Sequence, residues 1–417
     1  MLSPSDPIIH EPTPPERSTP ATIDITNDSP SVPDPLEQVA EQSARVHRVS
    51  AKPARRTPLY ASFPALADLL STIHHYYLEK VDGAPALSYA AEWILDNYYV
   101  IQQALRQIKE DLPPTYYTEL PKLNDDENGD STLNGYPRIY AVAMALLNEI
   151  DYQLDAERIV RFALAYQARQ PLNTGELWAL PIMLRLGVVQ RIALAAGQLS
   201  GQLTDSFAAN AALPDFFAGF TKRDVEGDLL SEEQDEAAIS HAIPSLRLLD
   251  SLDWKDMFER ISLVHQALAN DPARVYSYMD FATRDRYRHV IETLYRRVDL
   301  NEVEITEAVV DLAARQGGAP ADAARTDHGG PAVDGELAAN AEATHEPGLR
   351  IDAARTRHVG YYLIDAGRPL LEQRINYQPS VGERAIRWAF AHASVIYFLL
   401  VCVAILAVVG LAGFYLR

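Results

Sequence analysis

The sequence predicts an all-α protein, with an irregular multi-helix domain followed by one C-terminal transmembrane helix. Apolar residues recur at three- and four-residue spacing through most of residues 58–313, and no run of alternating strands separated by turns is present. Residues 394–416 form a stretch of 23 apolar or small residues. As a helix this stretch reaches about 35 Å, enough for a hydrocarbon core of ~30 Å.

Composition limits the possible functions. The 417 residues carry a net charge of −20 with a pI near 4.9, so a nucleic-acid partner is not expected, because phosphate neutralisation needs a basic face. Cys402 is the single cysteine, so no intrachain disulfide can form. The chain is therefore compatible with a reducing compartment.

The first 57 residues are predicted to be a disordered tail. Residues 1–35 hold nine prolines and no apolar segment of the signal-peptide kind. Such a composition buries too little apolar surface to offset the entropy cost of ordering.

The helical domain is predicted over residues 58–313. Its second helix, over 84–110, must end at Leu112, because Pro113 disfavours helical geometry in the residue before it. Asn173 and Glu176 have capping-box spacing at the start of a long helix, which Pro181 should kink.

Later helices have similar signals. Asn301 and Glu304 predict another capping box, and Asp271-Pro272 predicts a helix start with proline at the first helical position. Residues 314–350 are predicted to be a low-complexity Ala/Gly linker, and residues 351–383 to be a helical return segment of the same domain.

Residues 384–417 are predicted to be a juxtamembrane segment and the transmembrane helix. Arg384, Arg387 and Trp388 precede the span as membrane-anchoring residues. The positive-inside rule then places the helical domain in the cytoplasm, with the lipid bilayer as a partner. The alternative for the apolar stretch is a buried core helix.

Six blocks, taken in order, resemble the N-terminal region of bacterial cyclic β-1,2-glucan synthases. They are "EWILDNYYVIQQALRQIKEDLPPTYYTELPKL", "NGYPRIYAVAMALL", "GELWALPIMLRL", "SLRLLDSLDWKDMFERISLVHQAL", "VYSYMDFATRDRYRHVIETL" and "RHVGYYLIDAGRPLLE". The resemblance covers roughly residues 60–313 and 351–417. The chain is similar to a truncated or split piece that stops after the first span.

The resemblance implies an inner-membrane protein that makes a cyclic β-1,2-glucan from UDP-glucose with a divalent metal. No Asp-x-Asp metal motif occurs, so we expect no catalytic, cofactor or metal site in this chain. Arg384-Ala-Ile-Arg387-Trp388 fits a loose processive-transferase pattern, but its position favours a membrane anchor. The implied partners are the transferase and transmembrane segments of the synthase, in cis or in trans.

Other charged residues have both a structural and a functional interpretation. Glu92 and Asp96 lie four apart, as an acid/base pair of an all-α glycosidase would, but pairing with arginine or capping is the simpler expectation. Other single carboxylates offer the same choice: Glu119, Glu176 and Asp280. A metal patch at His74, His75 and Glu79 is disfavoured, because adjacent histidines point to different helix faces.

The basic helix near residue 290 has the strongest claim to a ligand, although a salt-bridged face is the default. Five arginines are candidates for contact with an anionic ligand or lipid: Arg284, Arg286, Arg288, Arg296 and Arg297. Tyr116 and Tyr117, in the proline-rich corner over 111–123, are expected to pack two helices with their hydroxyls left in water.

We therefore expect a non-catalytic scaffolding or regulatory module of a cyclic β-1,2-glucan synthase. One alternative is an all-α carbohydrate-active enzyme that uses Glu92 or Glu176 with Asp280. Another is an independent membrane-anchored adaptor. Convergent carboxylates in a deep cleft would favour the enzyme.

Overall fold

The computed structural model describes residues 34–50, 58–81, 88–124, 133–203, 232–316 and 354–415. In these residues every regular element is a helix, and strand-type pairing is confined to the isolated bridges Val49–Leu123 and Lys122–Pro137. The predicted all-α class is confirmed.

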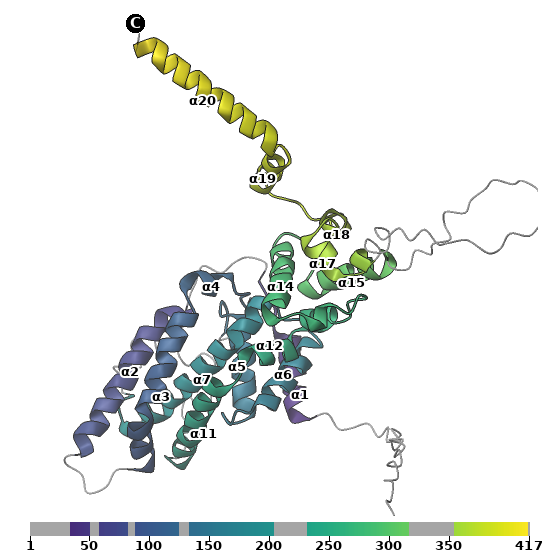
Figure 1. Ribbon diagram of the computed structural model, residues 1–417. Helices are drawn as coiled ribbons and strands as arrows, with labels where there is room; N and C mark the ends of the chain where they lie inside the picture. Colours follow the sequence, from purple (N-terminus) through teal and green to yellow (C-terminus); the bar gives the residue numbers. More distant parts are fainter. Residues whose placement is uncertain are drawn as a thin grey trace, which may run out of the picture. The chain divides into compact units, whose positions relative to one another are not determined.

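The helices of the first half of the described chain are α1 (Pro35–Val46), α2 (Pro58–Val81), α3 (Tyr89–Asp111), α4 (Pro114–Glu119), α5 (Arg138–Glu149), α6 (Ala156–Gln167) and α7 (Thr174–Ser200). Those of the second half are α11 (Glu232–Ser251), α12 (Trp254–Ile261), α13 (Leu263–Leu268), the short 3₁₀ helix η1 (Tyr276–Tyr278), α14 (Phe281–Tyr295), α15 (Glu302–Gln316), α17 (Val359–Ile364), α18 (Arg368–Arg374), α19 (Val381–Ala391) and α20 (Ala393–Tyr415). Figure 1 uses the same labels.

Helix α7 forms the centre of the larger of two hydrophobic clusters. Helices α2, α3, α5, α11 and α12 pack against it (Figure 1). Nearly all its side chains are buried. A helix that is covered on all sides can be apolar all round. At Gly187 an added Cβ would lie 2.6 Å from Leu147 Cδ1 and 2.8 Å from Met144 Sδ, so glycine lets α5 approach α7 closely.

The smaller cluster lies where α13, η1, α14, α15, α17 and α18 meet. Val264 of α13, Ile291 of α14 and Val309 of α15 are buried there beside Tyr362 of α17. Helices α17 and α18 follow residue 350 in the chain, yet they pack with α14 and α15 (Figure 1). Residues 354–377 thus complete a core that residues 263–316 begin.

Part of the predicted disordered tail is helical, which corrects the prediction for residues 35–46. In α1, Leu36, Ala40 and Ala44 lie four residues apart and are buried against α5 and α6. A short apolar stripe of one leucine and two alanines is a weak helix signal in a sequence. It is enough to hold a helix in place when other helices offer an apolar surface for it to pack on. Residues 1–33 and 51–57 of the predicted tail lie outside the described residues.

The predicted ends of other elements fit to within a few residues. Helix α3 starts at Tyr89, where the Ser88 hydroxyl accepts from Ala91 N at 3.3 Å, and it ends at Asp111 before Leu112 and Pro113. Helix α15 continues to Gln316, so the predicted linker start at 314 is three residues early in the described part. The rest of that linker, from 317 to 350, lies outside the described residues.

Candidate functional site

A polar and aromatic cavity of about 510 Å³ lies where five helices meet. We call it the tryptophan cleft, and its lining residues are Asp111, Tyr116, Gly175, Trp178, Pro181, Ile182, Arg185, Trp254 and Glu292. They come from the end of α3, from α4, from one side of α7, from the start of α12 and from α14. The cleft is therefore assembled from segments far apart in the chain.

One face of α7 supplies most of this lining. Gly175, Trp178, Ile182 and Arg185 follow at intervals of three and four residues, which places them on the same side of a helix. The start of α7 is fixed by the predicted capping box, which is confirmed. Its two bonds are Glu176 N to Asn173 Oδ1 at 2.8 Å and Asn173 N to Glu176 Oε2 at 3.0 Å.

Tyr116 joins the proline-rich corner to this helix. Its hydroxyl donates to the Gly175 carbonyl at 2.6 Å, and burial raises the pKa of Tyr116 well above its ordinary value. The hydroxyl is therefore a protonated donor at neutral pH, and the prediction that it is left in water was wrong. Tyr117, the next residue, is fully buried, with the Lys122 ammonium 3.8 Å from its ring centroid.

Two partly exposed indoles line the cleft, and a neighbouring group holds each in place. Trp178 stacks on Phe258 with ring centroids 4.6 Å apart and an interplanar angle of 15°. Trp254 donates from Nε1 to the Leu249 carbonyl at 2.9 Å. Each indole is thus fixed by a contact within the protein while part of its surface stays accessible.

The charged lining residues are mainly acidic. Asp111 is exposed and the Glu292 side chain is 21% exposed, whereas the Arg185 side chain is 7% exposed and pairs with Asp250 at 3.0 Å. The Arg185 Nε is buried without a hydrogen-bond partner among the described residues. Because Asp250 already balances the guanidinium charge, the cleft is unfavourable for an anion.

A smaller cavity of about 160 Å³ adjoins the cleft through Glu292, which lines both. We call it the acidic pocket, and its lining residues are Glu119, Asn173, Glu292, Tyr295, Arg296 and Glu302. Arg296 bonds to Glu292 at 2.8 Å and to Glu119 at 3.1 Å. Burial raises the pKa of Glu302 to about 7, although Glu302 accepts from Thr174 N at 2.9 Å and from Thr174 Oγ1 at 2.6 Å.

Glu176 has a structural role beside the cleft. It is fully buried, and besides its part in the capping box it pairs with Arg138, whose Nε donates to Oε1 at 2.8 Å. Burial alone would lower the pKa of Arg138, but the Glu176 carboxylate outweighs that effect and the pKa is raised. The two side chains form a buried ion pair at the junction of α5 and α7.

The other carboxylates considered for catalysis lie apart. Glu92 and Asp96 are exposed on α3, and Asp280 caps α14 by accepting from Thr283 N at 2.7 Å. Among the described cavities, none is lined by any two of Glu92, Asp96, Glu176 and Asp280. This arrangement does not give the convergent pair that the all-α enzyme needs.

The histidines of the second helix also have local contacts. The His74 ring stacks on Tyr98 with centroids 3.7 Å apart, and His75 Nδ1 lies 3.1 Å from the Ser71 carbonyl. Within the described residues no group of three or more His, Cys, Asp or Glu side chains is placed to hold a metal ion.

Three of the five candidate arginines have carboxylate partners. Arg284 and Arg288 pair with Glu259 at 2.8 and 3.0 Å, and Arg296 pairs in the acidic pocket. Arg288 is fully buried, with its guanidinium 4.8 Å from the ring centroid of Phe281. Contact of this helix with an anion or lipid stays a prediction; Arg286, Arg296 and Arg297 are its exposed members, and Arg296 among them has carboxylate partners.

Asp271 is a buried carboxylate that connects two distant segments of the chain, a role that the sequence did not indicate. It accepts from Val275 N at 3.0 Å and Val359 N at 3.1 Å, and it pairs with His358 Nδ1 at 2.8 Å. No α-helix starts at Pro272 in the described chain, so that prediction was wrong. Asp271 instead closes a turn and fixes the return segment, and hydrogen bonding to His358 helps lower the pKa of Asp271 despite burial.

The membrane-proximal residues are described as far as Tyr415. Arg384 is exposed, Arg387 pairs with Glu372 at 2.7 Å, and Trp388 stacks on His392 with centroids 4.8 Å apart. Helix α20 is long and apolar enough to span a membrane, and its described side chains are exposed. Helix α7 passes the same test of length and composition, but it is 94% buried as the core helix.

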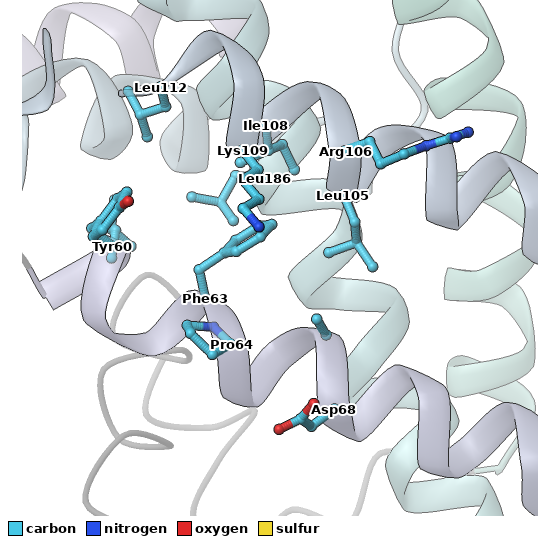
Figure 2. A pocket seen from close by; sticks show the side chains of 12 residues that line it. Tyr60, Phe63, Pro64, Asp68, Leu105, Arg106, Ile108, Lys109, Leu112 and Leu186 are labelled. Carbon is cyan, nitrogen blue, oxygen red and sulfur yellow. The ribbon is translucent and has the colours of Figure 1, made fainter. Parts of the chain in front are cut away.

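A third cavity, of about 360 Å³, lies between α2 and α3. Figure 2 shows Phe63 and Leu186 near its centre, with Arg106 extending away from them. Its lining is mainly aliphatic, with Asp68 and Lys109 as further charged members, so it is an apolar groove with few groups to orient a polar ligand.

No family model matches the chain. The chain is 26% identical over 362 residues to the cyclic β-(1,2)-glucan synthase NdvB of Rhizobium meliloti. The match covers 74% of this chain and 11% of that protein, so the chain spans about a ninth of its relative's length. The resemblance that the six sequence blocks indicate is confirmed, and the chain is related to a region of a cyclic β-(1,2)-glucan synthase.

Proposed function

We propose that this chain is a non-catalytic module of an inner-membrane cyclic β-1,2-glucan synthase and that it corresponds to the N-terminal part of such a protein. Its similarity to the Rhizobium meliloti synthase over 74% of the chain carries the proposal. In this role the helical unit scaffolds or regulates the segments that polymerise glucose from UDP-glucose.

The roles of the carboxylates support a non-catalytic module. Glu176 is held by Arg138 and by the α7 cap, Asp280 by the α14 cap, and Glu119 by Arg296. A catalytic acid or base must reach the substrate and change its protonation, which Glu176, buried in its ion pair with Arg138, does poorly. Asp280 and Glu119 are exposed, and neither shares a described cavity with Glu176. This set of contacts argues against the all-α enzyme.

Helix α20 supports a location at the bilayer. Its sequence is uncharged and its described side chains are exposed, as a span that faces lipid requires. In the proposed arrangement α20 crosses the inner membrane, Arg384 and Trp388 lie at the interface, and the helical unit is cytoplasmic. The independent adaptor would share this topology but would need no synthase.

The test is a chimera. The aligned region of the Rhizobium meliloti synthase is replaced by this chain in a strain that lacks its own synthase, and periplasmic cyclic glucan is measured. We expect glucan from the chimera and little from a version with the region deleted. Equal glucan from the chimera and the deletion would refute the proposal, and transfer of labelled glucose from UDP-glucose by the isolated chain would replace it with the enzyme.

A further inference from the structure

We propose that the tryptophan cleft binds a short, neutral glucose oligosaccharide and discriminates against nucleotide sugars. The choice of glucose as the sugar rests on the proposed function. The geometry that carries the proposal is independent of it: two fixed indoles and a set of charged side chains line one cavity of about 510 Å³. That volume is typical of small-molecule sites, which run from about 300 to 1,000 Å³.

The aromatic lining suits a β-glucose ring. Such a ring directs its hydroxyls outward around the edge and its C–H bonds toward the two faces, so the faces are apolar and flat. Trp178 and Trp254 offer apolar indole surface of the same shape. Because Phe258 and the Leu249 carbonyl already hold these indoles, binding costs little further side-chain entropy.

The charged lining suits the edge of such a ring. Asp111 and Glu292 supply acceptors for hydroxyl hydrogens, and the Arg185 guanidinium supplies donors for hydroxyl oxygens. Arg185 has one carboxylate partner, Asp250, which Nη2 contacts at 3.0 Å, and its Nε is buried, so the donors offered to the cleft are the terminal N–H groups. Its position is nevertheless fixed, since it is buried on α7.

The balance of charge selects a neutral ligand. Asp111 and Glu292 line the cleft, and Glu119 and Glu302 line the adjoining acidic pocket. The two arginines of these cavities, Arg185 and Arg296, are already paired with carboxylates. When Arg296 is set against one of its partners Glu292 and Glu119, and Arg185 against Asp250, Asp111 and one further carboxylate remain. A diphosphate would therefore meet net negative charge there, whereas a neutral glucan would carry no charge to be repelled. The cleft can therefore respond to product without competition from the donor sugar.

The other surfaces do not fit a sugar as well. The apolar groove between α2 and α3 lacks the polar edge groups, and nothing in the structure shows what covers it. Arg284 and Arg288 of the basic helix are occupied by Glu259. The Asp271 centre is filled by backbone amides and His358.

The experiment measures oligosaccharide binding to the full chain in lipid nanodiscs. Linear β-1,2-gluco-oligosaccharides are titrated by calorimetry and by tryptophan fluorescence, because two of the four tryptophans line the cleft. We expect saturable binding, and no heat from UDP or UDP-glucose at the same concentrations. No saturable binding of the oligosaccharide would overturn the proposal, as would binding of UDP-glucose with similar affinity.

Two variants locate the site. Trp254→Ala should weaken binding about tenfold or more, and Asp111→Ala about threefold or more, because each removes a contact made at the ligand. Asp111 is exposed at the end of α3, so its replacement should leave the fold intact, which unchanged thermal melting verifies. The matched controls are Trp93→Ala and Asp68→Ala, which lie outside the cleft and should bind as wild type.

Unchanged binding by Asp111→Ala and by a folded Trp254→Ala would overturn the assignment of the site, and so would equal losses in the controls. The result is separable from the chimera test. Oligosaccharide binding that depends on Trp254 and Asp111 supports the cleft even if the chimera makes no glucan. An active chimera whose isolated chain binds no oligosaccharide overturns the cleft and leaves the proposed module.

Discussion

Glu302 offers a sharp test of the electrostatics beside the cleft. The side chain is buried at the first residue of α15, and its carboxylate accepts from Thr174 N and Thr174 Oγ1. Burial raises the pKa of Glu302 from 4.5 to about 7, and the charges of Glu292 and Glu176 add to the effect, while the two hydrogen bonds oppose it. The perturbation is Glu302→Gln, which keeps an acceptor oxygen for Thr174 but cannot ionise.

The sign and size of the effect follow from the pKa. Since the folded pKa lies above the unfolded value, the folded state binds more protons between pH 4.5 and 7. The free energy of unfolding therefore falls as pH rises through that window, and the loss is complete above pH 7. At ~1.4 kcal/mol per pKa unit, the cost of ionising Glu302 is about 3 kcal/mol. Gln avoids this cost.

The assay is urea unfolding of the full chain in detergent at pH 5 and pH 8, with wild type and Glu302→Gln compared at each pH. We expect the two proteins to differ little at pH 5 and Gln to be more stable by about 2–3 kcal/mol at pH 8. Glu307→Gln, at an exposed position of the same helix, is the control and should show no such divergence. A wild-type–Gln difference that is equal at both pH values would refute the reasoning.

Three further results are expected. Glu176→Ala should lower the free energy of unfolding in urea by about 3–5 kcal/mol, because it leaves Arg138 buried without its carboxylate partner. The control Glu92→Ala, at an exposed position, should lower it by less than ~0.5 kcal/mol. Similar losses in both variants would contradict the structural role of Glu176. Burial lowers the pKa of Lys122 to about 7, so between pH 7 and 10.5 the unfolded state binds more protons than the folded state. The free energy of unfolding should therefore rise over that range in wild type, and rise less in Lys122→Met. Parallel pH profiles of the two proteins would argue against a lowered pKa of Lys122. If α20 spans the bilayer, reporters fused after Arg417 and inserted near residue 340 should report opposite sides; the same side for both would remove the proposed topology.

Local signals in the sequence predicted local structure well. The capping boxes at Asn173–Glu176 and Asn301–Glu304 both form, because each needs only residues three apart. The end of α3 before Pro113 follows from the backbone chemistry of proline alone. Asp271-Pro272 shows the limit of such signals. The dipeptide favours a helix start, but here it lies in a turn, and the Asp271 carboxylate bonds to His358, which is far away in the sequence.

The candidate site could not be predicted in the same way. Its lining extends from Asp111 to Glu292, and no spacing rule relates residues so far apart in a chain. Tyr116 was singled out for its proline-rich surroundings, but its partner is the carbonyl of Gly175, a backbone group that the sequence does not mark. The arginines near residue 290 gave a real excess of positive charge in the sequence, and the fold pairs three of them with acids from other helices.

Helix α1 is the clearest case in which tertiary contacts override a local signal, and it gives a last prediction. Leu36, Ala40 and Ala44 are buried, and Glu37 pairs with Arg161 of α6 at 2.9 Å. Burying a leucine and two alanines stabilises the fold by about a few kcal/mol, because each Å² of buried apolar surface contributes ~25 cal/mol. A chain starting at Asp34 should therefore melt several degrees higher than one starting at His47, whereas Leu36→Ala in the longer chain should account for ~2 kcal/mol or more. If the two truncations melt together, α1 adds nothing to the fold and the packing described for it is wrong.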